Sequence, residues 1–392
     1  MGAGPTQFKA ETSRLNAFNG RQKALGTRAN ATKSLMKPVI LDHLPDHLLS
    51  LPATELSQHL DGPTLVHLPG RNPQPLFVSV LQHGNEVSGW EAIRRLLKGR
   101  YARDPLPRSL VLLISNVRAA ARGQRHLADQ PDFNRCWPGA QSATTVWHDL
   151  FAEITAHVRA LKPFASIDIH NNTGENPHYA AVNRIEGQRL HLAALFSRTV
   201  IYFTEPLGVQ SLAFGEFCPA VTLECGLAAE LDGTDHALAY LETVLNLDSL
   251  RTTIPSPEDL ELFRMIATVT VRRDIDFGFT SEATELRFLP GLDRLNFREM
   301  PPGTRLATTV NGTHRPLIAR SHHGHDVSAE CFDYSDNRIV TRRPLMPAML
   351  STDEEIVRQD CFCYLMERIG LDEHRRFAQS GAEQSELPET QP

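Results

Sequence analysis

Two histidines and a glutamate stand where short apolar runs end. His83 and Glu86 follow the run Phe77–Leu81, and His170 follows Ile167–Ile169. In open α/β sheets, binding and catalytic sites form just beyond the carboxyl ends of strands. Two His and one carboxylate, with water in the fourth position, make a catalytic zinc arrangement, and a His and a Glu three residues apart can reach one ion from a single turn. Alone the His-x-x-Glu pair also fits a surface turn, but together with His170 it predicts a site for one Zn²⁺ ion.

Two further carboxylates occupy positions next to this predicted site. Asp168 lies two residues before His170, so both side chains share one face of a strand and the Asp168 carboxylate can orient the imidazole. Glu224 ends the apolar run Val221–Leu223. Hydrolysis at zinc needs a base that takes a proton from water and delivers it to the leaving amine, and a partly desolvated Glu suits that role. We therefore predict Glu224 as the general base, with an exposed Glu at a sheet edge as the alternative.

A basic loop offers groups that recognise anions. Arg122 and Arg125 precede the segment Asp132–Arg135. The planar guanidinium of Arg135 can pair with a carboxylate through two parallel hydrogen bonds, and Asn134 adds an amide donor. We predict that these two residues bind a substrate carboxylate and that one upstream arginine stabilises an oxyanion. A solvated, purely structural arginine loop is the alternative.

Alternating strand and helix patterns must position these residues. Helical spacing is clearest in Val146–Leu161, whose apolar residues recur every three or four positions and predict one buried face. Strands and helices alternate up to the helical stretch Asp235–Leu247, after which short alternating strands follow. We predict an α/β fold: a three-layer α/β/α domain with a mainly parallel or mixed sheet, plus a smaller C-terminal β-domain. The predicted strands are Leu76–Leu81, Ser109–Ser115, Ser166–Ile169, Val200–Phe203, Ala220–Leu223, Ile266–Arg272, Glu285–Phe288, Arg305–Thr309 and Pro316–Ala319.

Changes in the sequence pattern divide the chain into four predicted parts. Residues 1–37 are basic and lack a hydrophobic period, which indicates a flexible extension. Residues 38–251 form the predicted zinc-dependent catalytic domain, and residues 252–350 form the β-rich domain. Residues 351–392 combine a predicted helix over Glu354–Arg368 with a polar, acidic tail that we expect to be disordered.

Composition excludes several classes of protein. The formal net charge of −6 argues against general binding of nucleic acid, because such binding needs a basic surface that neutralises phosphates. No run approaches the roughly 18 apolar residues that span a bilayer, and the N-terminus lacks the pattern of a signal peptide. The six cysteines lack CxxC spacing and fit free, buried thiols in a reducing compartment. We predict a cytoplasmic protein that binds neither nucleic acid nor membrane, and an oligomer is compatible with the sequence.

Four elements of the sequence together resemble the zinc carboxypeptidase superfamily, most closely its aspartoacylase/succinylglutamate desuccinylase branch. They are the pair His83 and Glu86, His170 after its apolar run, Glu224 after its own, and the loop that carries Arg122, Arg125 and Asp132–Arg135. The resemblance covers roughly residues 75–345. It implies a C-terminal β-domain that caps the site. It also implies roles for residues of this chain: one zinc ion on His83, Glu86 and His170, a substrate carboxylate on Asn134 and Arg135, an oxyanion on Arg125, and a general base at Glu224.

Two departures from the family pattern limit what the resemblance implies. The loop between Arg125 and Asn134 is longer than the family's usual spacing, so Arg122 is the alternative for the oxyanion. Aspartoacylases carry a further arginine shortly before the base, whereas Ser211–Leu223 contains none, so specificity for aspartate is not expected. Tyr179 either lines the substrate pocket or packs in a loop.

The predicted reaction is zinc-dependent hydrolysis of an amide bond next to a free carboxylate. The resemblance to this branch favours deacylation of an N-acyl amino acid, a small-molecule substrate. One alternative is a metallocarboxypeptidase that removes the C-terminal residue of a peptide, because a peptide end presents the same amide and carboxylate. A second alternative is a non-catalytic binding protein on the same scaffold, although the predicted ligands and base are all present.

Overall fold

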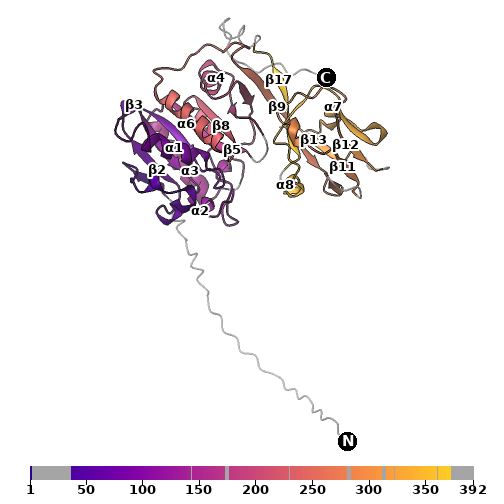
Figure 1. The fold of residues 1–392 in the computed structure, drawn as a ribbon, viewed down its shortest axis with the longest axis horizontal. Helices are drawn as coiled ribbons and strands as arrows, with labels where there is room; N and C mark the ends of the chain where they lie inside the picture. The colour runs from indigo at the N-terminus through magenta and orange to yellow at the C-terminus, as the bar shows by residue number, and fades with distance from the viewer. Residues whose placement is uncertain are drawn as a thin grey trace, which may run out of the picture. The chain divides into compact units, whose positions relative to one another are not determined.

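The structure of the chain is a computed structural model (Figure 1). It describes Met1 and residues 37–142, 144–172, 176–228, 230–279, 284–310, 315–321, 323–359 and 361–371. Most of the predicted N-terminal extension, residues 2–36, and the predicted polar tail from about Ser380 to Pro392 lie outside the described residues. The predicted domain boundaries stay predictions.

Four neighbouring parallel strands form the middle of a mixed, twelve-stranded sheet (Figure 1). In sheet order they are β4 (Leu106–Ile114), β3 (Gly70–Val80), β5 (Ala165–Asn172) and β8 (Ala220–Leu227). The register pairs Ser79 with Asp168 and His170 with Glu224. Because paired residues of neighbouring strands point to the same side, these four side chains share one face of the sheet.

Further strands extend the main sheet on both sides of these four. β2 (Thr64–Leu68) pairs antiparallel with β4, and β1 (Val39–Leu41) pairs parallel with β2. On the other side, β6 (Tyr179–Val182) runs antiparallel to β8. β7 (Thr199–Tyr202) is parallel to β6, and β9 (Glu261–Val271) is parallel to β7. The predicted mixed sheet is confirmed.

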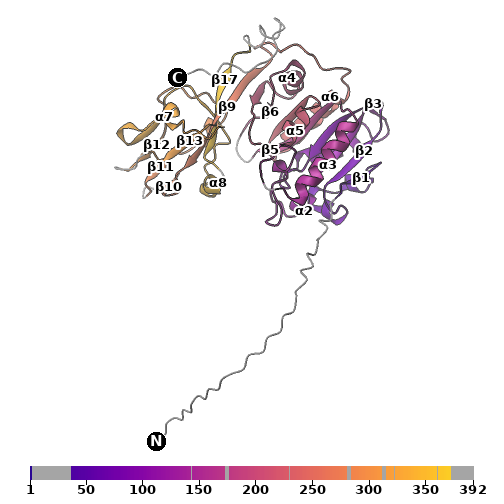
Figure 2. The same cartoon turned by 180° about the vertical axis from the view of Figure 1, so that it is seen from behind.

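Helices cover both faces of this sheet, as the sequence predicts. Val78 and Val80 of β3 pack in a buried cluster with residues of α1, α4 and α6, whereas Phe77 packs with residues of α3 and α5 (Figure 2). Alternate side chains of the strand therefore pack against the helices on opposite faces of the sheet, as the two-residue period of a strand requires. The helices of this part are α1 (Ser88–Lys98), α2 (Val117–Ala120), α3 (Val146–Ala160), α4 (Gly187–Ala194), α5 (Gln210–Gly215) and α6 (Leu231–Leu245), with 3₁₀ helices at Leu48–Ser50, Ala53–Gln58 and Phe133–Arg135.

The C-terminal strands are divided between two sheets. Three of them continue the main sheet: β13 (Leu317–Arg320) and β17 (Cys363–Ile369) each pair antiparallel with β9, and β16 (Met346–Ala348) pairs with β17. A separate five-stranded sheet supplies the predicted smaller β structure. In order its strands are β10 (Phe277–Gly278), β11 (Leu286–Phe288), β12 (Arg305–Thr309), β15 (Arg338–Thr341) and β14 (Phe332–Asp333). The short helices nearby are α7 (Ser328–Cys331) and α8 (Glu354–Gln359), with 3₁₀ helices at Leu292–Leu295 and Ser335–Asn337.

The predicted helix over Glu354–Arg368 is wrong for most of its length. α8 ends at Gln359, and β17 begins at Cys363. β17 pairs along its whole length with β9, and it buries Leu365 and Met366 in the sheet. Pairing with a strand about a hundred residues earlier outweighs local helix propensity, which is only a weak preference.

Two observations concern the predicted cellular location of the protein. In the part of the chain that the structure describes, no helix has the length and apolar character needed to cross a bilayer. All six cysteines lie in that part; they are buried, and no disulfide joins them. The predicted cytoplasmic location stays a prediction.

Gly84 lets the loop between β3 and α1 pack closely against α2. Its amide donates a hydrogen bond to the carbonyl oxygen of Arg125 at 3.0 Å. A Cβ atom at this position would lie 2.2 Å from the nitrogen of Ala120 and 2.3 Å from the carbonyl carbon of Ala119. The loop that carries the two predicted zinc ligands can occupy this place only because residue 84 has no side chain.

We expect Gly84→Ala to lower the free energy of unfolding by about 1–3 kcal/mol, the usual effect of overpacking. Urea denaturation measures the change. Gly62→Ala is the matched control, because nothing lies within 4 Å of a Cβ placed there, and its effect should stay within about 0.5 kcal/mol. Equal unfolding midpoints for the two variants would contradict the proposed packing of this loop.

Candidate active site

The structure brings His83, Glu86 and His170 into one buried cluster. His83 and Glu86 lie in the loop between β3 and α1, and His170 lies near the end of β5. One nitrogen of each imidazole and one oxygen of the carboxylate all lie within 4.8 Å of one another. The three residues are 3%, 5% and 3% exposed. Three side chains from distant segments therefore converge as the sequence predicts.

Glu86 bridges the two imidazoles. Its Oε1 accepts a hydrogen bond from Nδ1 of His83 at 2.7 Å, and its Oε2 accepts one from Nδ1 of His170 at 2.7 Å. Burial raises the pKa of Glu86, but the charges of His83 and His170 and their hydrogen bonds outweigh burial and hold that pKa well below its usual value. The Glu86 carboxylate is therefore stabilised in its ionised form by the two imidazoles.

A second carboxylate supports each imidazole from its other nitrogen. Nε2 of His170 lies 2.8 Å from Oδ2 of Asp168, whose Oδ1 accepts a hydrogen bond from Oγ of Ser79 at 2.5 Å. Nε2 of His83 lies 3.0 Å from Oδ1 of Asp132. Carboxylates in these positions fix the ring orientation of metal-binding histidines. The sequence indicates Asp168 by its two-residue spacing, whereas Asp132 carries no comparable signal relative to His83.

The donor set fits a zinc ion. Burial lowers the pKa of His170, but Asp168 and Glu86 outweigh burial and hold that pKa well above its usual value. The cluster thus favours a positive charge between its side chains. Two imidazoles and one carboxylate, buried and supported by further carboxylates, are the ligands that a catalytic zinc ion takes.

Glu224 lies beside the cluster on the same face of the sheet. It is the register partner of His170 on β8. The side chain is partly exposed, but its Oε2 is buried and has no hydrogen-bond partner among the described residues. Burial raises the pKa of Glu224 to about 8; the negative charge of Glu86 adds to the rise, and the charge of His170 opposes it. A carboxyl group with a pKa in this range can both accept and return a proton.

The structure places Arg125, rather than Arg122, near the cluster. Nη1 of Arg125 lies 3.8 Å from Oε1 of Glu86, and its Nη2 donates to Oδ2 of Asp132 at 2.9 Å. Arg122 is exposed and acts on Asp129, whose pKa is lowered first by the hydrogen bond from Arg118 and further by the charge of Arg122.

Asn134 and Arg135 belong to a short 3₁₀ helix that Asp132 caps. Oδ1 of Asp132 accepts a hydrogen bond from the Asn134 amide at 2.8 Å, so one carboxylate orders both this turn and His83. Oδ1 of Asn134 accepts a hydrogen bond from the Gln210 amide at 3.4 Å. Burial raises the pKa of Asp132, but the hydrogen bond and charge of His83 and the charges of Arg125 and Arg135 outweigh burial and hold that pKa well below its usual value. The predicted carboxylate-binding pair therefore adjoins the cluster through Asp132.

Tyr179 is buried on β6 as the register partner of Glu224. Its ring lies 4.7 Å from the ring of Phe297, centroid to centroid. Burial raises the pKa of the Tyr179 hydroxyl well above its usual value, and the negative charges of Glu224 and Glu86 raise it further. The predicted pocket residue thus lies next to the predicted base and packs against the C-terminal part of the chain.

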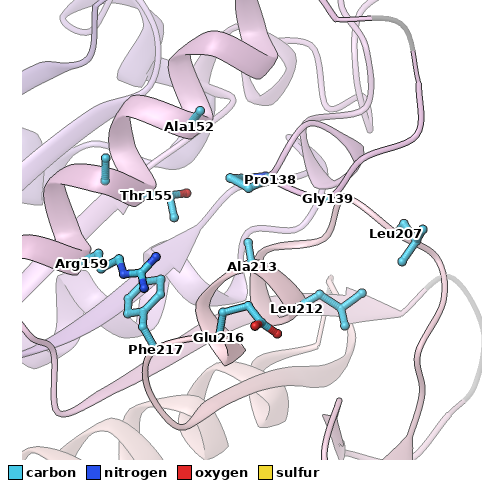
Figure 3. Close-up of a pocket in the computed structure, with 12 residues that line it drawn as sticks. Pro138, Gly139, Ala152, Thr155, Arg159, Leu207, Leu212, Ala213, Glu216 and Phe217 are labelled. Atoms are coloured by element: carbon cyan, nitrogen blue, oxygen red, sulfur yellow. The ribbon is translucent and has the colours of Figure 1, made fainter.

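A hollow on the surface of the protein lies apart from His83, Glu86, His170 and Glu224. It has a volume of about 510 Å³ and lies between α3 and α5, with Thr155, Arg159 and Phe217 among its lining residues (Figure 3). A second hollow of about 320 Å³ shares Leu207 with it and includes Arg135. None of these four residues lines either hollow.

Comparison with known proteins identifies the domain that carries the site. Residues 74–247 match the model of the succinylglutamate desuccinylase/aspartoacylase catalytic domain. No curated protein sequence matches the chain.

Among solved structures, the succinylglutamate desuccinylase of Chromobacterium violaceum superposes with a TM-score of 0.53 and 14% identity, covering 82% of this chain and 98% of that one. The succinylglutamate desuccinylase of Vibrio cholerae gives a TM-score of 0.52 and 14% identity, covering 80% and 87%. The family match therefore assigns residues 74–247 to the succinylglutamate desuccinylase/aspartoacylase catalytic-domain family, and the solved structures show that the fold is shared.

Proposed function

We propose that this protein is a zinc-dependent amidohydrolase that deacylates an N-acyl amino acid. One observation carries the proposal: His83, Glu86 and His170 form a buried cluster with the donor set of a catalytic zinc site, and Glu224 lies beside it on the same sheet face. Membership of the catalytic domain in the desuccinylase/aspartoacylase family supports an acyl amino acid as substrate.

Asn134 and Arg135 would bind the free carboxylate of the substrate. The guanidinium of Arg135 can form two parallel hydrogen bonds with a carboxylate, which fixes both its position and its plane. Asp132 holds this turn and His83 through the same Oδ1 atom. Recognition of the carboxylate and position of the cluster are therefore coupled through one side chain.

The chain's own groups supply the proton transfer and the charge stabilisation. A zinc ion, when bound, polarises the scissile carbonyl and makes a bound water more acidic. Glu224 takes a proton from the attacking water and delivers it to the leaving amine, for which its raised pKa of about 8 is suited. Arg125, close to Glu86, stabilises the negative charge that develops on the carbonyl oxygen.

The metal assignment predicts a stoichiometry. The purified protein should contain about one zinc ion per chain, measured by mass spectrometry of the metal. His83→Ala and His170→Ala should each lower the affinity for zinc by more than about tenfold, since even loss of a supporting carboxylate has an effect of this size. His43→Ala, at an exposed position, is the control and should keep the metal. Unchanged zinc content in both ligand variants would refute the site.

The base assignment predicts a variant that binds metal without turning over. Glu224→Gln should retain zinc but lower kcat for N-acetyl and N-succinyl amino acids by about 10²–10⁴-fold, because the amide cannot accept the proton. Glu258→Gln, an exposed position, should leave kcat unchanged. Undiminished turnover in Glu224→Gln would show that another group is the base. Release of the last residue from long, unblocked peptides by the wild type would instead favour a carboxypeptidase.

A further inference from the structure

Asn172 is a buried amide that the described residues leave without a hydrogen-bond partner. It is 5% exposed, and neither its Nδ2 nor its Oδ1 has a hydrogen-bond partner among the described residues. Its neighbour Asn171 differs: Nδ2 donates to Oγ of Ser88 at 2.9 Å and to the carbonyl oxygen of Gly226 at 3.0 Å, and Oδ1 accepts from the Ser88 amide at 3.1 Å. Leaving a buried polar group unpaired costs about 1–3 kcal/mol. Hydrogen bonding within the described part of the chain therefore does not explain why an asparagine is buried at position 172.

Strand geometry directs Asn172 to the face that carries the cluster. It lies two residues beyond His170 on β5, and side chains two residues apart point to the same face. The pairing shifts here because Cys225 and Gly226 together lie opposite Asn171. The extra residue belongs to β8, so the alternation along β5 is kept. At about 3.3 Å per residue, Asn172 lies roughly 7 Å beyond His170 along the strand.

Hydrogen bonds through Gln210 link the predicted carboxylate-binding turn to the start of β5. Oγ of Ser166, near the start of the strand, accepts a hydrogen bond from Nε2 of Gln210 at 2.5 Å. The Gln210 amide in turn donates to Oδ1 of Asn134. On this face of β5, Ser166 is thus linked to the carboxylate-binding turn, His170 belongs to the cluster, and Asn172 lies beyond His170.

We propose that Asn172 is a specificity-determining residue that hydrogen-bonds the acyl group of the substrate. The inference rests on the proposed function. With the substrate carboxylate at Asn134 and the scissile amide at the cluster, an acyl group that extends toward the end of β5 would meet Asn172. The Asn172 carboxamide both donates and accepts hydrogen bonds and carries no charge. It therefore matches an acyl group with an uncharged polar substituent, such as a hydroxyl, better than an unsubstituted alkyl group.

The test compares N-acetyl and N-glycolyl derivatives of one amino acid, which differ by a single hydroxyl. The wild type should show a higher kcat/KM for the N-glycolyl compound. Asn172→Leu should reduce that preference by about tenfold, because the hydroxyl loses its partner. An unchanged ratio of the two kcat/KM values in Asn172→Leu would overturn the inference. Wild-type protein that holds zinc but hydrolyses neither compound would overturn the proposed function itself.

Thermal stability separates a substrate-binding role from a structural one. Because no described partner is lost, Asn172→Leu should unfold at the same temperature as the wild type or higher. Asn171→Leu is the matched comparison on the opposite face, and it should lower the melting temperature because it breaks the bonds to Ser88 and Gly226. A melting temperature for Asn172→Leu as low as that of Asn171→Leu would assign Asn172 a structural role and overturn the inference.

Discussion

The carboxylate of Glu86, buried between two imidazoles, is the interaction on which the site depends. A buried anion is costly unless partners compensate its charge, and here His83 and His170 do so at 2.7 Å each. Asp132 and Asp168 then hold the far nitrogens of the same rings. The cluster is thus a set of alternating hydrogen-bond donors and acceptors, and its two imidazoles and carboxylate are the donor set of the proposed zinc site.

The parallel strands make this convergence possible. Because β3, β5 and β8 run in the same direction, the segments that follow them meet at one edge of the sheet, and register places Glu224 directly beside His170. Residues from the C-terminal part of the chain also contact this region. Phe297 packs on Tyr179, and Met349 contacts Asn176 through its sulfur at 3.1 Å. The surroundings of the predicted base therefore depend on two parts of the chain that are far apart in sequence.

Much of the site could be read from short segments. Apolar runs mark buried strands, and strand ends in an α/β sheet gather polar side chains, so His83, Glu86 and His170 could be predicted to meet. A spacing of two residues was enough to place Asp168 beside His170. The expected alternation of strands and helices also gave the layers of the catalytic part, since each apolar face must be buried against another element.

What the tertiary structure decided involves contacts between distant segments. The hydrogen bond from His83 to Asp132 depends on how one loop lies over another. That the amide of Asn172 has no partner among the described residues is likewise known only from the folded structure. β17 is a strand because β9 offers it a partner, which a local helical pattern could not reveal. Sequence by itself determined the chemical groups and the faces they share, because these follow from residue type and short-range periodicity. Pairing, burial and satisfaction of polar atoms are properties of the assembled chain, because each depends on partners supplied by residues far away in sequence.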